Sequence, residues 1–351
     1  MRDAVRELGI ECLMGRGIFE LSGGQMQSVA FASAWACKPS VYVLDEPSSN
    51  LDPPSMEKLA SFISKAKSSG SAVIIAEHRL SYLASVADRY LLFEGGSVAA
   101  EWDAQRFLGL SDAERESCGL RSSEPPKLAD LMQRLSRPAS AFPAVEARGI
   151  YAGYERGVPV LEGITVSFDP GRVVGVVGRN GAGKSTLLKC LAGIKKEELG
   201  HVRFQGSVVP PKRRPNHAFL VMQDPDYQLF RPSVRDELAS AAPSPSDVDE
   251  LRLEAVLEEF GLGDVADRIP HRSRRQKQRC VCAIASESGA QALLLDEPTS
   301  GLDFRNMERL ALILREEASR GKTVAVVSHD TEFLSKPATR SCSSSEPACK
   351  D

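Results

Sequence analysis

Short runs of aliphatic residues alternate along the chain with longer stretches that mix apolar and polar positions. The runs predict buried strands, and the amphipathic stretches between them predict helices. The predicted strands are Val41–Leu44, Val73–Ile75, Val173–Val177, Leu293–Leu295 and Val324–Val327. The predicted helices include Ser55–Ala66, Lys184–Leu191 and Met307–Ala318. Strands that alternate with helices are typical of a mostly parallel sheet, so we expect an α/β fold.

The chain also repeats part of itself. Residues 45–52 (DEPSSNLD) recur 251 positions later as residues 296–303 (DEPTSGLD), and the same offset carries His78 onto His329. Matches at one constant offset indicate two homologous lobes in tandem. Position 1 corresponds to Arg252, so the first copy has no counterpart of the 108 residues from 144 to 251.

The repeat predicts the domain organisation. We expect an incomplete first lobe at 1–102, a Pro/Ser-rich linker at 103–143, a second lobe at 144–340 and an atypical tail at 341–351. The tail is predicted because the first copy has the apolar run Tyr90–Phe93, whereas the second copy has Ser341–Ser345 at that place. The serine-rich segment is not expected to form the equivalent apolar strand.

Composition narrows the class of protein. The 351 residues are 42% hydrophobic and 26% charged, with a formal net charge of −3, which is ordinary for a soluble globular protein. No apolar run reaches the roughly 18 residues that span a bilayer, no signal peptide is recognisable, and the eight scattered cysteines suit reduced thiols. The basic run from Arg268 to Arg279 lacks interleaved aromatic residues, so we expect no nucleic-acid partner.

A glycine-rich phosphate-binding motif follows the predicted strand Val173–Val177. Residues 178–186 (GRNGAGKST) fit G-x-x-x-x-G-K-[ST] and lead directly into a predicted helix. Glycines let backbone N–H groups converge on phosphate oxygens, and the helix N-terminus adds partial positive charge. Lys184 is predicted to reach the β- and γ-phosphates, and Ser185 to bind Mg²⁺. The predicted phosphate-binding residues are Gly178, Asn180, Gly181, Gly183, Lys184, Ser185 and Thr186.

Two acidic residues and a histidine supply candidate catalytic groups. The apolar strand Leu293–Leu295 ends in Asp296, a candidate for the Mg²⁺ shell, and Glu297, a candidate for orienting or deprotonating the attacking water. His329 follows another strand and is predicted to contact the γ-phosphate. A histidine at a strand end is often only structural, but the matching His78 favours a functional role.

With these motifs the chain resembles the ATP-binding subunits of ABC transporters. Residues 21–25 (LSGGQ) match the signature motif of that family, with a serine hydroxyl and glycine amides at the start of a helix. The resemblance implies an ABC-type P-loop ATPase fold in two tandem lobes, the first incomplete, that binds ATP and Mg²⁺. It also implies that Tyr154 stacks on adenine. A core role for Tyr154 and a substitute role for Tyr151 stay open.

In the family two domains pair head to tail, so that each ATP lies between the Walker A loop of one and the signature of the other. The resemblance therefore implies one complete shared site. The second copy would supply Lys184, Gln223, Asp296, Glu297 and His329, and the first Ser22, Gly23, Gly24, Gln25 and Asp52. The opposite site would be degenerate, because Arg274 and Arg275 stand where the second signature needs glycines.

A narrower resemblance concerns residues 223–230 (QDPDYQLF), which look like the Q-loop of energy-coupling-factor importers of vitamins and transition metals. Gln223 would then touch Mg²⁺ and the attacking water. The implied partners are a transmembrane coupling protein and a substrate-binding membrane subunit, with self-pairing or a second ATPase chain also possible. The implied location is the cytoplasmic face of the membrane, as a peripheral protein. Two alternatives stay open: a soluble twin-ATPase of the translation or repair type, and a gene remnant without function.

Overall fold

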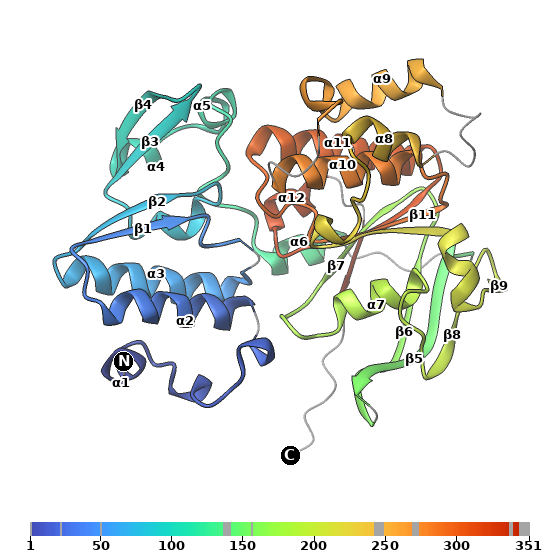
Figure 1. Ribbon diagram of the computed structural model, residues 1–351, viewed down its shortest axis with the longest axis horizontal. Coiled ribbons are helices and arrows are strands. Elements are labelled where there is room, and N and C mark those ends of the chain that lie inside the picture. The colour runs from blue at the N-terminus through green and yellow to red at the C-terminus, as the bar shows by residue number, and fades with distance from the viewer. Residues whose placement is uncertain are drawn as a thin grey trace. The chain divides into compact units, whose positions relative to one another are not determined.

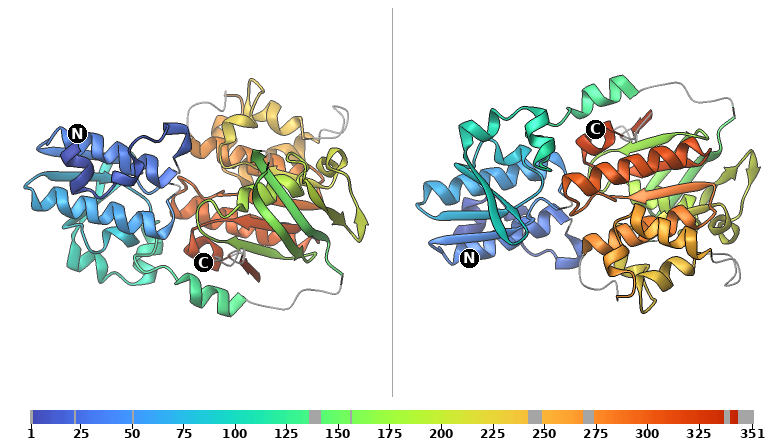
Figure 2. Two further views of the ribbon diagram at one scale, coloured as in Figure 1. Left: turned by 90° about the horizontal axis from the view of Figure 1, so that it is seen from below. Right: turned by 90° about the horizontal axis from the view of Figure 1, so that it is seen from above.

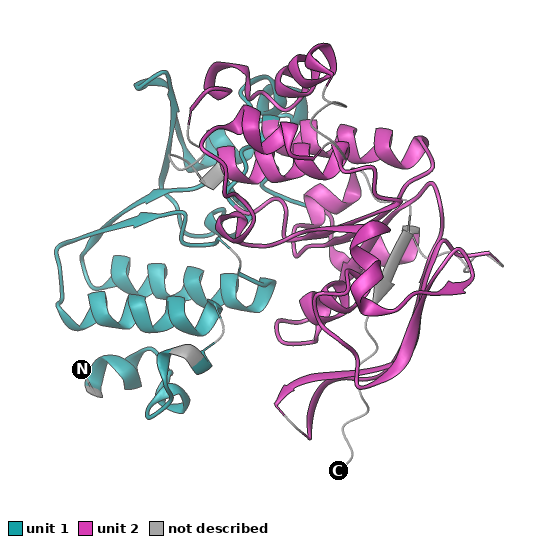
Figure 3. Cartoon of the chain, turned by 45° about the vertical axis from the view of Figure 1, so that its right-hand side comes forward, with its two compact units in different colours: residues 1–125, 301–305 teal, residues 126–300, 306–351 magenta. Residues whose placement is uncertain are grey.

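The computed structural model describes residues 2–21, 23–49, 51–135, 142–155, 157–241, 249–268, 274–336 and 340–343. The chain divides into two compact units (Figure 3). Unit 1 comprises residues 1–125 and 301–305, and unit 2 comprises residues 126–300 and 306–351. Among the described residues, no helix is both long enough and apolar enough to cross a membrane.

Unit 1 is built around a short parallel sheet with helices on one of its faces. Its helices are α1 (Arg2–Glu7), α2 (Gly23–Ala36), α3 (Pro53–Ser68), α4 (Ala104–Leu108) and α5 (Asp112–Ser117), with 3-10 turns at Glu11–Leu13, Ile18–Glu20 and Ser81–Leu83. Its strands are β1 (Val41–Asp45), β2 (Ala72–Ala76), β3 (Arg89–Glu94) and β4 (Ser97–Asp103). Strands β1 and β2 pair in parallel, and β3 and β4 form a separate antiparallel hairpin. The core includes Phe31 of α2, whose ring stacks on Tyr42 and Phe62 with centroids 5.6 and 5.3 Å away.

Unit 2 contains both a parallel and an antiparallel sheet. Its strands are β5 (Val145–Glu155), β6 (Val158–Phe168), β7 (Val173–Val177), β8 (Leu199–Phe204), β9 (Ser207–Val208), β10 (Ala218–Val221), β11 (Ala292–Asp296), β12 (Thr323–Val327) and β13 (Arg340–Ser343). Its helices are α6 (Leu128–Leu135), α7 (Lys184–Leu191), α8 (Val234–Ala239), α9 (Glu250–Glu259), α10 (Arg274–Glu287), α11 (Phe304–Ser319) and α12 (Thr331–Ser335), with 3-10 turns at Pro211–Asn216, Pro225–Tyr227 and Gly263–Val265.

The parallel sheet of unit 2 runs in the order β10-β11-β12-β7-β13, and the antiparallel sheet in the order β6-β5-β8-β9. Strands β5 and β6 lie side by side, as the green ribbons in Figure 2 show. One buried cluster joins residues of both sheets to helix α7, among them Ile150, Val202, Leu188, Leu191 and Leu294. This core fixes α7 against the parallel sheet. The α/β fold predicted from the sequence is confirmed.

The repeat extends to the bounds of the elements. Helices α2 and α3 and strands β1 and β2 of unit 1 recur as α10, α11, β11 and β12 of unit 2 (Figure 1). Each end of each element is displaced by 251 residues. Glu46, which follows β1, and Glu297, which follows β11, also adopt the same left-handed backbone conformation, with φ of 43° and 48°. Non-glycine residues rarely adopt this conformation, and such backbone strain clusters at functional sites.

Two boundary predictions differ from the structure. The described residues of the predicted linker 103–143 include three helices, and the chain passes from unit 1 to unit 2 between residues 125 and 126. Residues 104–125 remain with unit 1 because Phe107 is buried there, stacked on Tyr90 with ring centroids 3.7 Å apart. The prediction of a tail from residue 341 is also wrong for residues 341–343, which belong to strand β13 and pair in parallel with β7. Backbone hydrogen bonds form this strand without an apolar sequence. Residues 344–351 lie outside the described residues.

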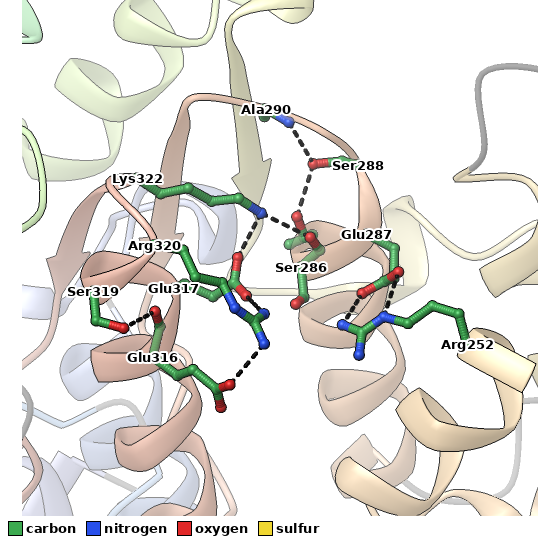
Figure 4. A network of polar contacts seen from close by, with 11 residues as sticks. Arg252, Ser286, Glu287, Ser288, Ala290, Glu316, Glu317, Ser319, Arg320 and Lys322 are labelled. Atoms are coloured by element: carbon green, nitrogen blue, oxygen red, sulfur yellow. Dashed lines mark hydrogen bonds and ion pairs between the residues drawn. The ribbon is translucent and has the colours of Figure 1, made fainter.

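A polar network joins the helices of unit 2 at the edge where β11 and β12 begin (Figure 4). Glu317 of α11 is buried and pairs with Lys322 and Arg320. Lys322 also donates to the carbonyl of Ser286 on α10, 2.8 Å away, while Glu287 pairs with Arg252 of α9 at 2.6 Å. These contacts hold α9, α10 and α11 together at the edge opposite to the candidate site.

Candidate active site

All predicted site residues of unit 2 except Tyr154 lie where four neighbouring parallel strands end. The glycine-rich loop follows β7, Gln223 comes two residues after β10, Asp296 ends β11, and His329 comes two residues after β12. The registers Val221–Leu295, Asp296–Val327 and Val327–Val176 bring these strand ends to one edge of the sheet. Ligands of open α/β sheets bind at this edge.

The glycine-rich loop depends on glycine at two positions. Gly181 and Gly183 have φ of 82° and 83°, which side chains strongly disfavour. A Cβ added at Gly183 would also lie 2.5 Å from Leu161 Cδ2. The loop therefore turns tightly into α7, whose first backbone N–H groups have no acceptor within the helix. Such an N-terminus attracts phosphate oxygens.

Lys184 is buried beneath this loop and holds its shape. Its Nζ donates to the carbonyls of Gly178 and Arg179 at 2.7 and 2.9 Å. The same Nζ lies 3.2 Å from His329 Nε2, which lies 2.8 Å from Asn180 Oδ1. The structure therefore brings the lysine, the asparagine and the histidine of the prediction into one connected group.

Asp296 fits the predicted role of a magnesium ligand. Its side chain is buried, and burial raises the pKa of its carboxyl group, although a hydrogen bond from Ser185 and the charges of Lys189 and Lys184 act in the opposite direction. The Oδ1 atom is buried without a hydrogen-bond partner. A carboxylate oxygen that lacks a partner, next to a serine hydroxyl, is suited to bind Mg²⁺ directly or through its water.

No cluster of three or more His, Cys, Asp or Glu side chains suited to a metal ion occurs among the residues that the structure describes. Mg²⁺ is commonly bound by one or two protein oxygens together with substrate phosphates, so this arrangement agrees with a Mg²⁺–ATP site. Ser185 and Asp296 would supply the protein oxygens. Gln223 follows the neighbouring strand, and its predicted contact with the ion stays a prediction.

Glu297 is held in a fixed orientation beside His329. Its backbone N–H donates to Val327 O at 2.9 Å. Its Oε2 accepts from Ser328 Oγ at 3.2 Å and from the backbone N–H of His329 at 3.4 Å. Its Oε1 lies 3.7 Å from His329 Nε2. A buried carboxylate oriented in this way can accept a proton from a nearby water.

Tyr154 is not a core residue, because 61% of it is exposed. Its hydroxyl lies 3.4 Å from Thr186 Oγ1 at the glycine-rich loop. Lys195 and Lys189 place their Nζ atoms 5.1 and 5.9 Å from the centre of its ring. The ring is exposed beside the loop, and its predicted stacking on adenine stays a prediction.

The predicted residues of the first copy belong to unit 1. Gly23, Gly24 and Gln25 form the start of α2, whereas Ser22 lies outside the described residues. Gly24 packs closely against α3, because a Cβ there would lie 2.4 Å from Ser55 Oγ. Asp52 caps α3 by accepting from the backbone N–H of Ser55 at 3.0 Å. In the second copy Arg274 begins α10, and residues 269–273 lie outside the described residues.

Two features of the site were not predicted. Ser328 orients Glu297, and its only sequence signal is its place between a strand and His329. Lys195 and Lys189 near Tyr154 could not be found by spacing, because the antiparallel strand that carries Tyr154 is remote in sequence from both lysines.

A buried ion pair supports the far end of helix α7. Arg214 is 1% exposed, and its guanidinium donates to the carbonyl of Cys190 at 2.7 Å and forms two hydrogen bonds with the Glu197 carboxylate at 2.8 and 2.5 Å. Burial is the largest single influence on the Glu197 carboxyl group and raises its pKa, but the hydrogen bonds from Arg214, a backbone hydrogen bond and the charges of Arg214 and Lys196 together hold this pKa below its usual value. The pair ties the end of α7 to the segment before β10.

The change Glu197→Gln is expected to lower the free energy of unfolding at neutral pH by about 3 kcal/mol, because it leaves the buried charge of Arg214 unbalanced. A lowered pKa means that the stabilising contribution of Glu197 is present above its ordinary value of 4.5 and is lost as the pH falls through the lowered value. Urea unfolding of the original chain and of Glu197→Gln should therefore show a difference in the free energy of unfolding that becomes smaller at acidic pH. The exposed neighbour provides the control, since Glu198→Gln should change little. A difference independent of pH would contradict this account.

These features are those of an ATP-binding P-loop protein, with Glu297 as the candidate catalytic carboxylate. The profile of the ABC transporter family matches residues 1–49 and 161–300. An ABC transporter ATP-binding protein of Treponema denticola is 36% identical over 345 residues, which cover 95% of this chain and 68% of that protein. Another from Methanosarcina acetivorans is 29% identical, over 95% of this chain and 63% of that protein. The chain belongs to the ABC transporter family, as one of its ATP-binding and ATP-hydrolysing proteins.

Solved structures give the same class. The archaeal ribosome recycling factor aABCE1, solved with the ribosomal stalk protein aP1, matches 97% of this chain and 65% of that one, with 26% identity and a TM-score of 0.66. The protein cbiO1 of Clostridium perfringens, part of the ABC transporter complex cbiONQ, matches 57% of this chain and 84% of that one, with 26% identity and a TM-score of 0.50. The chain spans about two thirds of the length of its longer relatives.

Proposed function

We propose that the chain is the ATP-hydrolysing subunit of an energy-coupling-factor importer for a vitamin or a transition metal ion. It would work at the cytoplasmic face of the membrane, bound to a transmembrane coupling protein that acts with a substrate-binding membrane subunit. The main observation behind this proposal is that the segment from Gln223 to Phe230 is fixed to unit 2 by hydrogen bonds and an ion pair, while two of its aromatic side chains remain exposed. The similarity to cbiO1, part of a transporter complex, supports it.

Three anchors fix this segment to unit 2. Gln228 accepts from the backbone N–H of Met222 and donates to the carbonyl of Leu220, both at 2.7 Å. Asp226 pairs with Lys277 of α10 at 2.5 Å. The carboxylate of Glu237 on α8 accepts from two backbone N–H groups. These two donors are the amides of Phe230 and Arg231.

The anchors leave two aromatic side chains on the surface. Tyr227 and Phe230 are 71% and 80% exposed, although the segment between them contributes the buried Leu229. Large apolar groups displayed on a fixed segment indicate a protein contact. Because the segment begins at Gln223, beside the candidate magnesium site, a partner bound here can be coupled to the state of the nucleotide.

The side chains at the strand ends account for hydrolysis of ATP. Lys184 and the loop amides would bind the phosphates, and Glu297 would take a proton from the attacking water while His329 holds the γ-phosphate end of the site. Mg²⁺, when bound, neutralises charge between the phosphate oxygens. Ser328 and the backbone of His329 keep the Glu297 carboxylate aimed during this step.

We also propose that the two copies act as tandem ATPase lobes that share one competent site, in which Lys184 faces the signature that contains Ser22. The change Ser22→Arg should then abolish steady-state ATP hydrolysis, because a bulky cation prevents the serine and the following amides from approaching the γ-phosphate. The matched control is Ser273→Arg at the same position of the second copy, which should leave turnover within about twofold. Hydrolysis at the original rate in Ser22→Arg would exclude the shared site.

The exposed aromatic pair gives a test of the membrane partner. Tyr227→Asp combined with Phe230→Asp should weaken association with the co-expressed transmembrane coupling protein by about 100-fold, because two buried contacts become charged. Binding of ATP should persist. Leu251→Asp, on another highly exposed apolar residue of unit 2, is the control. Unchanged association in the double variant would reject the importer assignment for this segment.

A second candidate is a soluble twin-ATPase. It is favoured by the match to the archaeal ribosome recycling factor over 97% of this chain. Such a protein would need neither Tyr227 nor Phe230 to contact a membrane protein. If the Tyr227→Asp, Phe230→Asp double variant and the Leu251→Asp control both associate with ribosomes rather than with membranes, the chain is better described as a soluble twin-ATPase.

A further inference from the structure

The exposed aromatic ring at the end of strand β5 is attached both to its own sheet and to helix α7. Although Tyr154 itself is exposed, the backbone next to it is tightly packed. A Cβ added at the preceding Gly153 would lie 2.2 Å from Val158 O on β6, so the two strands approach too closely here for a side chain. The hydroxyl of Tyr154 lies 3.4 Å from Thr186 Oγ1 in the first turn of α7. Both ends of the residue are therefore restrained.

Two lysines add a further restraint on the ring. The Nζ atom of Lys195 lies 5.1 Å from the centre of the Tyr154 ring, and that of Lys189 lies 5.9 Å from it. Both distances are within the roughly 6 Å over which an ammonium group is attracted to the face of an aromatic ring. Both lysines are also partly buried, and this attraction is stronger where water competes less for the charge.

The turn that follows α7 fixes the position of Lys195. The backbone N–H of Lys195 donates to Lys189 O at 3.0 Å, so the turn closes on the last residues of the helix. Gly193 begins this turn with a φ of 79°, and a Cβ there would lie 2.1 Å from Pro211 O. Glycine is needed at this position because both the backbone conformation and the close approach exclude a side chain.

The buried ion pair at the end of α7 fixes the other side of the same turn. Glu197 pairs with Arg214, and the backbone N–H of Glu198 donates to Tyr151 O at 2.7 Å. Tyr151 and Tyr154 both belong to β5, so the turn and the ring are attached to one strand. The backbone that carries Lys195 is therefore held at a fixed position relative to the ring.

We propose that Lys195 and Lys189 are positioning residues for the nucleotide base, which hold the Tyr154 ring in the orientation that stacks on a purine. The exposed part of the ring is left for the base. Without the lysines, only the strand and Thr186 would restrain the ring, and more of its motion would have to be lost when a base binds. This inference rests on the proposed stacking of adenine on Tyr154, and it is independent of the membrane partner and of the transported substrate.

A direct contact with phosphate is the competing role for these lysines. The two roles differ in the ligands that they affect. Inorganic tripolyphosphate carries the phosphates of ATP without a base, so a lysine that orients the ring changes the affinity for ATP alone, whereas a lysine that binds phosphate changes both affinities. Lys195 is the better position for this test, because the charge of Lys189 also acts on Asp296.

The test measures binding of ATP and of inorganic tripolyphosphate to the full chain by calorimetry in the presence of Mg²⁺. Lys195→Met is expected to weaken ATP binding by about fivefold and to leave tripolyphosphate binding within about twofold. Lys195→Arg should bind ATP within about twofold of the original chain, since a guanidinium is attracted to the ring as well. Lys196→Met is the matched control, because it removes the same charge from the exposed neighbouring position and should change neither affinity.

A second set of variants asks whether Lys195 acts through the ring. Tyr154→Leu alone should weaken ATP binding by about tenfold or more, because it removes the stacking surface. Adding Lys195→Met to that variant should then change the affinity by less than about twofold, since no ring remains to be held. A further fivefold loss in the doubly substituted chain would overturn the proposal.

Two other results in Lys195→Met would also overturn it. An equal loss for ATP and for tripolyphosphate would assign Lys195 to the phosphates, and an unchanged ATP affinity would leave it without a role in binding. Unchanged ATP affinity in Tyr154→Leu would overturn both this inference and the stacking on which it rests. The site built on Lys184 and the importer assignment are judged by their own variants, so none of these results would be mistaken for their failure.

Discussion

Replacing Lys184 with alanine is expected to weaken ATP binding by about 100-fold or more. Its ammonium group lies at the start of α7, buried beneath the loop that would hold the phosphates. It also organises that loop, through hydrogen bonds to the carbonyls of Gly178 and Arg179. The substitution therefore removes both a charge facing the β- and γ-phosphates and an internal support of their binding loop.

The measurement is equilibrium binding of ATP in the presence of Mg²⁺, with thermal unfolding recorded for each variant. Lys212→Ala, at an exposed lysine of the same unit, should bind as the original chain does. An unchanged affinity in Lys184→Ala would mean that the glycine-rich loop is not the nucleotide site.

The second large effect is expected for Glu297→Gln, which should keep ATP binding within about twofold while lowering turnover by a factor of about 100 to 1,000. The amide has nearly the same shape as the carboxylate, and its oxygen can still accept from Ser328 and from the backbone of His329. It cannot accept a proton from water. The variant should therefore trap ATP rather than release it.

Single-turnover and steady-state hydrolysis distinguish this role from a structural one, since a structural role would change binding as well. Glu57→Gln, on the exposed side of α3 in unit 1, serves as the control. Hydrolysis at the original rate in Glu297→Gln would require another base.

Much of the site could be predicted because its chemistry lies at strand ends. Buried strands give short aliphatic runs, and the first polar residues after them are brought together by a parallel sheet. Asp296, Glu297 and His329 follow this rule, and the structure unites the last two with Lys184 and Asn180.

Contacts between remote segments could not be read from the sequence. Arg214 pairs with Glu197 and caps the end of α7, yet nothing in its local sequence distinguishes it from the basic residues beside it. Strand β13 was not predicted because its backbone, and not an apolar pattern, pairs it with β7. The exposure of Val41, Val43 and Ile74 on strands β1 and β2 could not be predicted either, because these residues have the composition of a buried strand.

We propose that the chain holds one competent nucleotide site, built on Lys184. The most direct test is the number of ATP molecules that the purified Glu297→Gln chain retains in Mg²⁺ at saturating ATP. We predict one ATP per chain, reduced to none when Lys184→Ala is added. Two ATP molecules per chain, or retention of ATP by the doubly substituted chain, would contradict the account.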